Sequence, residues 1–257
     1  MLGVILAAIA AFLGPDRAVA VSPERTGLFS GRIAKADDYY LGRAKLSNVD
    51  QGLQLLRQAV AENPNDYEAW WRISRSQNFL GRARDERSPQ AAIQAFQAGV
   101  DAGQRAVHLQ PNRVEGHLWM GVNYGLLAEE EGWIKGLRLL DTVRNEMEAV
   151  TRLNPDYEQA AGQRTLARLY YRAPFFKGGD KQRSIQLLQD CLKRYPHDSF
   201  ALLYLADDYL AVGRRDQARA LLEQILSLCP DPQYGPELAA NQAEARDRLQ
   251  RELRSGK

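Results

Sequence analysis

Apolar positions recur at intervals of three and four along most of the chain, which is the spacing of one face of an α-helix. The pattern is clearest near the C-terminus, in residues 199–213 and 216–228. Their expected inner-face positions are Leu202, Leu205, Ala206, Tyr209, Ala218, Leu222, Ile225 and Leu226. Ala206 and Ala218 are small enough for two helices to approach closely, and Tyr209 would fill the space beside them. The pattern in residues 198–231 therefore predicts an antiparallel helical hairpin.

Prolines mark the ends of the helical segments. The five that do so are Pro64, Pro111, Pro155, Pro196 and Pro230, and each is followed within three residues by Asp or Asn. Proline cannot continue a helix and moves its predecessor out of the helical region. The last two of these prolines are 34 residues apart, which is the period of the tetratricopeptide repeat; the other intervals are longer and require insertions.

The pattern predicts an all-α fold, a right-handed superhelix of about five tetratricopeptide-like hairpins. Their expected bounds are 31–65, 66–112, 113–156, 157–197 and 198–231. A polar helix over 235–254 would cap the open end of the array. In the fourth hairpin the inner face matches only after two inserted residues. Its two helices are separated by a loop that contains PFFKGGD, in which Asp180 is the expected N-cap of the second helix.

The first twenty residues have the layout of a secretory signal peptide. Leu2–Leu13 is uncharged and apolar, Gly14 and Pro15 interrupt it, and Ala18-Val19-Ala20 offers small residues for cleavage. We expect a signal peptide at 1–20, a linker at 21–30, and export to a bacterial periplasm with no membrane span after cleavage. The apolar run is shorter than the ~20 residues that span a bilayer, so a full membrane span is not expected. The alternative to a cleaved signal is a retained short anchor or a buried helix.

Composition and motifs exclude several classes of function. Lys and Arg number 34 against 32 Asp and Glu, so the near-neutral chain lacks the basic excess expected of a nucleic-acid-binding protein. His108, His117 and His197 do not form a metal-ligand pattern, and neither cysteine has a flanking histidine that could activate it as a nucleophile. The sequence predicts no enzyme activity, cofactor or metal. Cys191 and Cys229 are expected to be buried free thiols rather than a disulfide.

The sequence favours a binding function over catalysis. The expected binding surface is the concave side of the array, which the first helix of each hairpin would line. The predicted binding residues are Trp71, Arg75, Asn78, Leu118, Arg164, Arg168, Tyr171, Phe200 and Asp207. Arginine can bind a carboxylate with two hydrogen bonds, and Trp and Tyr supply apolar surface for a partner to contact. Because Arg164 and Arg168 are expected to be exposed, replacing them should weaken binding without unfolding the chain. Alternatively, Trp71 and Tyr171 pack against the inserted segments and the arginines are merely solvated.

The order of VNYG, PFFKGGD and PDPQYGPE along the chain resembles the periplasmic tetratricopeptide T components associated with TRAP transporters. That resemblance implies oligomerisation, a solute-binding protein as partner, and a hydrophobic ligand in a central channel. Two hypotheses result. The first is an exported scaffold whose groove binds a protein or peptide. The second is a T component that holds a hydrophobic or amphipathic small ligand. An open groove would favour the first, and an enclosed apolar pocket the second.

Overall fold

The computed structural model describes residues 23–83 and 88–255, so the predicted signal peptide lies outside the described residues. The helices of these ranges are α1 (Pro23–Leu41), α2 (Leu46–Glu62), α3 (Tyr67–Ala83), α4 (Pro89–Leu109), α5 (Val114–Glu130), α6 (Trp133–Leu153), α7 (Tyr157–Arg172), α8 (Lys181–Arg194), α9 (Ser199–Ala211), α10 (Arg215–Ser227) and α11 (Gly235–Ser255). One 3-10 turn, Phe175–Lys177, lies between α7 and α8. These ranges contain no β-strand, so the predicted all-α class is confirmed.

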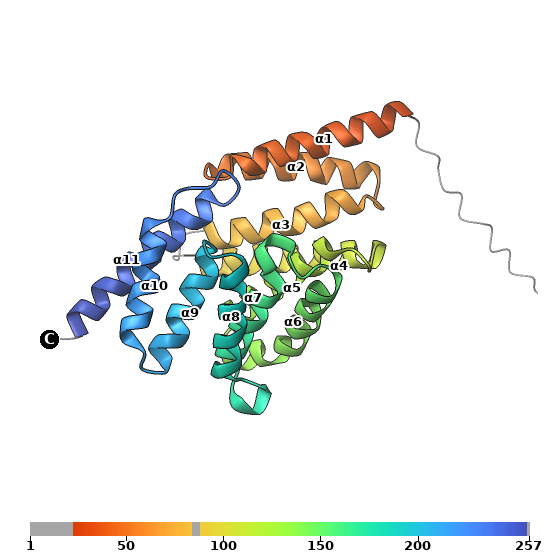
Figure 1. The fold of residues 1–257 in the computed structure, drawn as a ribbon. Coiled ribbons are helices and arrows are strands. Elements are labelled where there is room, and N and C mark those ends of the chain that lie inside the picture. Colours follow the sequence, from red (N-terminus) through yellow and green to blue (C-terminus); the bar gives the residue numbers. More distant parts are fainter. Residues whose placement is uncertain (1–22, 84–87, 256–257) are drawn as a thin grey trace, which may run out of the picture.

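Consecutive helices pair as antiparallel hairpins, and the hairpins stack into a curved array (Figure 1). The α1–α2 hairpin lies at one end, and α10 and α11 lie at the other. The segment that precedes α11 returns toward the turn between α1 and α2, so the two ends of the array approach each other. Helix α1 begins at Pro23, upstream of the start predicted at residue 31 and inside the expected linker.

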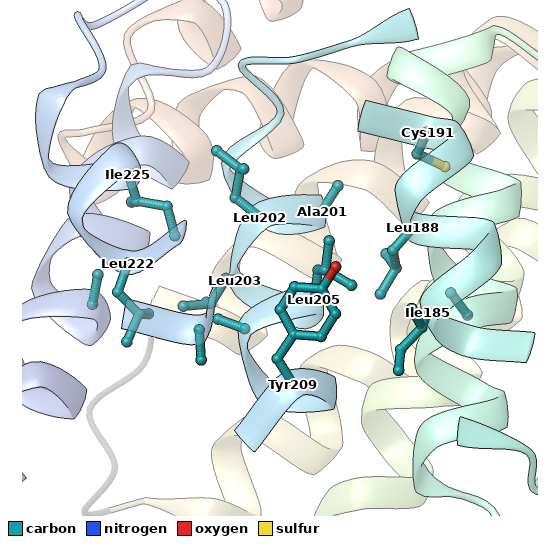
Figure 2. Packing of buried hydrophobic residues seen from close by; sticks show 14 of the residues in the cluster. Ile185, Leu188, Cys191, Ala201, Leu202, Leu203, Leu205, Tyr209, Leu222 and Ile225 are labelled. Carbon is teal, nitrogen blue, oxygen red and sulfur yellow. The ribbon is translucent and has the colours of Figure 1, made fainter. Parts of the chain in front are cut away.

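The α9–α10 hairpin shows how the predicted inner face packs. Around α9, small and large apolar side chains interdigitate between α8 and α10 (Figure 2). Ala206 and Ala218 have no exposed surface, and Tyr209 is 6% exposed, so the small residues do lie where helices meet. Cys191 is buried in this cluster as a free thiol. Cys229 is also free but exposed, which corrects the expectation that both thiols are buried.

Two carboxylates begin helices of the fourth and fifth hairpins. Asp180 accepts a hydrogen bond from the backbone N–H of Arg183 at 3.0 Å, as predicted for the N-cap of α8. Asp198 accepts from the backbone N–H groups of Phe200 and Ala201 at 3.0 and 3.2 Å, and so caps α9. Such caps satisfy backbone donors that have no partner within the helix.

The start of α7 is irregular. Glu158, Gln159 and Ala160 have φ angles of 49°, 57° and 60°, which is the left-handed region that non-glycine residues rarely adopt. The segment coincides with the fourth hairpin, where the repeat pattern requires two inserted residues. It carries the Glu158 carboxylate to Tyr234, whose hydroxyl donates to Glu158 Oε2 at 2.8 Å. The irregular turn thus joins α7 to the segment before α11.

Candidate functional site

Two adjacent cavities lie between the first helices of successive hairpins. Their volumes are about 420 Å³ and about 300 Å³. Helices α3, α5, α7 and α9 contribute to the walls of both. The wall residues common to the two cavities are Arg82, Val122, Thr165, Phe200 and Tyr204. The cavities therefore form the centre of the surface on which the sequence predicts binding.

The larger cavity combines apolar walls with arginines. Its apolar walls include Val122, Leu126, Leu137, Leu140, Leu169 and Leu203. Its charged wall residues are Arg82, Arg168, Arg172, Arg248 and the single carboxylate Glu129. This arrangement suits a group that has both an apolar part and a negative charge.

Arg82 is the arginine of this wall with the fewest partners. Its Nε donates to Asn78 Oδ1 at 3.2 Å, and its guanidinium carbon lies 5.6 Å from the centre of the Phe200 ring. Within residues 23–83 and 88–255, no carboxylate forms an ion pair with it. By contrast, Arg168 and Arg248 both contact Asp207, and Arg172 lies 3.6 Å from Glu129. Arg82 is therefore the best-placed cation for a ligand.

The smaller cavity is closed at one end by contacts between distant parts of the sequence. Arg43, whose side chain is 2% exposed, donates from Nε and Nη2 to the Glu237 carboxylate at 2.9 and 2.6 Å. Its guanidinium also donates to the carbonyl oxygens of Gln233 and Tyr40. Because Arg43, Gln233, Tyr40 and Glu237 all line this cavity, the same contacts form its wall.

Six of the nine predicted binding residues line these cavities. Arg75, Asn78, Leu118 and Arg164 line the smaller one, Arg168 lines the larger one, and Phe200 lines both. Several of these side chains already have protein partners. Arg75 pairs with Asp37 at 2.6 Å, and Asn78 Nδ2 donates to Asn123 Oδ1 at 3.2 Å. The structure brings the predicted residues together but leaves fewer of their polar groups free than expected.

Arg164 and Arg168 differ from the sequence-based expectation. Arg164 forms an ion pair with Asp198, and the side chains of the pair are 14% and 2% exposed. Arg168 pairs with Asp207 at 2.7 Å, and its side chain is 22% exposed. The prediction that both arginines are exposed and dispensable for folding is therefore corrected, because each neutralises a carboxylate that burial would otherwise penalise.

The other three predicted residues lie outside the cavities. Trp71 is 7% exposed and packs in a cluster with Tyr67 and Ala106, and its indole N–H donates to Glu68 Oε2 at 2.8 Å. The centre of the Tyr171 ring lies 5.2 Å from the guanidinium carbon of Arg168. Asp207 is held between Arg168 and Arg248. Trp71 offers no free apolar area to a partner, which corrects its predicted role.

Several wall residues were not among those predicted from the sequence. Arg82 lies one helical turn beyond Asn78 on the same face of α3. Continuing the predicted binding face of α3 by one turn would therefore have included Arg82. Tyr204 lies one turn beyond Phe200 in the same way. Tyr234 and Glu237 gave no such signal, because they reach the cavity from the far end of the sequence.

His117 has a structural role. Its ring nitrogens lie 2.6 Å from Glu146 Oε2 and 2.8 Å from the carbonyl oxygen of Pro111. The contact with Glu146 raises the pKa of His117.

Across the described ranges, no three His, Cys, Asp or Glu side chains gather as a metal site. The helices of those ranges also include none that is long and apolar enough to cross a membrane.

One buried carboxylate makes stability depend on pH. Asp208 is 1% exposed, and neither of its side-chain oxygens has a hydrogen-bond partner in the described structure. Burial raises the pKa of Asp208 from 3.8 to about 6. The folded state therefore binds this proton more tightly than the unfolded state, so Asp208 favours folding most below pH 4. That contribution is lost as the pH rises toward 6.

We expect Asp208→Asn to raise the free energy of unfolding at pH 8 by about 1–2 kcal/mol. One pKa unit corresponds to about 1.4 kcal/mol, and the buried amide loses part of the gain. Urea denaturation at pH 4 and pH 8 measures the effect. The benefit should vanish at pH 4, where Asp208 is protonated in the folded protein. An equal effect at both pH values would contradict the assignment.

Comparisons with known proteins support the repeat architecture. A family model described as regulator of microtubule dynamics protein 1-3 matches residues 32–162, and a tetratricopeptide repeat model matches residues 175–241. No curated protein sequence matches the chain. The chain is similar in fold to TTC0263, a thermophilic tetratricopeptide protein of Thermus thermophilus. That match has 22% identity and a TM-score of 0.62, and covers 84% of this chain and 98% of the other.

A second solved structure shows the same fold. It is PilW, described as a type IV pilus biogenesis factor, with 15% identity and a TM-score of 0.55 over 88% of this chain and 94% of that protein. At these identities the likeness concerns the fold alone. The first family model extends over just over half of the sequence, across the first three hairpins. The chain therefore belongs to the family described as regulator of microtubule dynamics protein 1-3.

Proposed function

We propose that the chain is a non-enzymatic interaction scaffold that binds an acidic segment of a partner protein between the first helices of its hairpins. Helical-repeat domains commonly use this side for binding. The observation that carries the proposal is the larger cavity, whose apolar walls carry four arginines and one carboxylate. A segment with an apolar side chain next to an Asp, a Glu or a chain terminus complements that wall.

Arg82 is the residue on which this proposal depends most. Its guanidinium stands beside Phe200, so a bound carboxylate could receive charge-assisted hydrogen bonds while an adjoining apolar group contacts the ring. Arg168 and Arg248 share Asp207 and contribute less free charge. Arg82 is also exposed, so its replacement should not unfold the protein.

We expect Arg82→Gln to weaken partner binding by roughly ten- to a hundredfold, since a hydrogen bond to a charged group contributes about 1.5–3 kcal/mol. The measurement is affinity capture from a cell extract, followed by mass spectrometry and by titration of the recovered partner. Arg219→Gln, which changes an exposed arginine of α10, is the matched control. Equal affinity for the parent chain and both variants would remove the cavity from the proposal.

A second candidate function is the binding of an amphipathic small ligand, as the resemblance to TRAP T components implies. The observation that favours it is the smaller cavity, which Arg43 and Glu237 wall at one end and whose volume of about 300 Å³ suits a small molecule. Native mass spectrometry of the purified chain distinguishes the two. A discrete added mass that organic extraction removes would favour the small ligand, and the same spectrum reads the oligomeric state.

We also propose that the protein acts outside the cytoplasm, on the basis of residues 1–20. Fusing residues 1–24 to a reporter that is active only after export should give activity, with cleavage after Ala20. Replacing Ala18 and Ala20 by bulky residues should block the cleavage. Activity that stays in the cytoplasm would refute the proposal.

A further inference from the structure

The loop between α7 and α8 presents two adjacent phenylalanines to solvent. Phe175 is 92% exposed and Phe176 is 73% exposed, on the 3-10 turn Phe175–Lys177. Figure 1 shows this loop projecting from the array, at the end of the view opposite the α1–α2 turn. Large aromatic side chains seldom stay fully exposed in pairs, and such exposure indicates a surface that is covered in use.

The tip is held in place by a set of hydrogen bonds. The backbone N–H groups of Lys177 and Gly179 donate to the carbonyl oxygen of Pro174 at 2.9 and 3.0 Å. From the neighbouring α6, Arg144 Nη2 donates to the carbonyl oxygen of Lys177 at 2.8 Å. Gly179 passes so close to the carbonyl oxygen of Ala173 that a Cβ atom at this position would collide with it. These contacts fix the turn while leaving both phenylalanine side chains pointing into solvent.

The residues around the tip are mainly basic. Segment 172–183 contains Arg172, Lys177, Lys181 and Arg183 but only one acidic residue, Asp180, whose carboxylate caps α8. Lys177 pairs with Asp141 at 3.3 Å. The cations of Lys181 and Arg183 lie over the rings of Tyr171 and Tyr170, and no carboxylate of the described residues forms an ion pair with either. The tip is thus an aromatic pair that is followed, in the first turn of α8, by two cations without a carboxylate partner among the described residues.

The size of the tip decides which kind of partner it fits. Two phenylalanines can bury roughly 300–500 Å², since each buries about 150–250 Å². A stable protein interface needs about 800 Å² on each partner. A projecting tip of this area, with two cations in the helical turn that follows it, instead matches the boundary between the headgroups and acyl chains of a bilayer that contains anionic lipids.

We infer that Phe175 and Phe176 insert into an anionic lipid surface, with Lys181 and Arg183 contacting the headgroups. The proposal concerns peripheral contact through this loop and is independent of the cavity between the first helices.

The test places a fluorescent reporter in the loop of the full chain. Phe176→Trp is mixed with vesicles of neutral phosphatidylcholine, alone or with about a third of anionic phosphatidylglycerol, prepared with and without brominated acyl chains. The added tryptophan should be quenched by the brominated chains and shift to the blue on the anionic vesicles. Leu46→Trp is the matched control, because Leu46 is a 40% exposed apolar residue at the start of α2, away from the loop. Both variants share the apolar N-terminal segment and the four native tryptophans, so the comparison depends on where the added tryptophan lies.

Changing Lys181 and Arg183 to Gln in the Phe176→Trp chain should raise the lipid concentration at half-maximal quenching about tenfold or more, since each cation near an anionic surface contributes about 1 kcal/mol. Phe175→Ala in the same chain should raise it by about tenfold. Quenching in Phe176→Trp no greater than in Leu46→Trp would overturn the inference and point to a protein partner for the tip. The inference would also be overturned if the quenching were the same on neutral and anionic vesicles and were unchanged by the Gln substitutions.

Discussion

Replacing Arg164 by alanine is expected to lower the free energy of unfolding by about 3 kcal/mol, because the change leaves a buried carboxylate without its counter-charge. That carboxylate belongs to Asp198, which is 2% exposed. One of its oxygens caps α9, and the other contacts Arg164. Urea denaturation at pH 7, followed by circular dichroism, measures the loss.

The matched control for Arg164 is Arg219→Ala, an exposed substitution that should change stability by less than about 0.5 kcal/mol. A double-mutant cycle with Asp198→Asn separates the pair from the packing of the arginine side chain. The combined variant should be less destabilised than the sum of the two single variants. Strict additivity, or an Arg164 variant as stable as the control, would contradict the ion pair.

The second large effect is expected at Arg43, and Arg43→Ala should destabilise the fold by about 3 kcal/mol. Its guanidinium is almost fully buried and joins the turn after α1 to residues 233 and 237. Without it, the Glu237 carboxylate and the Gln233 carbonyl oxygen lose their partner at the wall of the smaller cavity. Amide hydrogen exchange should therefore accelerate at the end of α1 and in the first turns of α11.

Arg57→Ala is the control for Arg43, since Arg57 is an exposed arginine of the neighbouring α2. It should leave both stability and exchange unchanged. If the Arg43 variant matched this control in both measurements, the two ends of the array would not be joined as described.

Local patterns in the sequence predicted the hairpins because each hairpin is built from nearby residues. The inner face of α9 and α10, the helix ends at prolines and the Asp180 cap all depend on spacings of three or four residues. The left-handed turn at Glu158, Gln159 and Ala160 gave no such signal beyond a gap in the repeat pattern. No glycine marks this turn, so its conformation depends on tertiary contacts such as that with Tyr234.

The binding surface was predictable only in part, for the same reason. Helical register places Arg75, Asn78 and Phe200 on the wall of a cavity. Register cannot reveal that a side chain already has a partner on another hairpin, as Arg164 has in Asp198. The contact between Arg43 and Glu237 spans 194 positions in the sequence, which no local pattern encodes.

We expect partners to bind between the first helices of the hairpins. A photo-crosslinking amino acid at Thr165, which lines both cavities, tests it directly. The matched probe replaces Glu223, an exposed residue of α10. With the captured partner present, position 165 should form cross-links that are lost in the Arg82→Gln background, and position 223 should form none. Cross-links from position 223 with none from position 165 would contradict it.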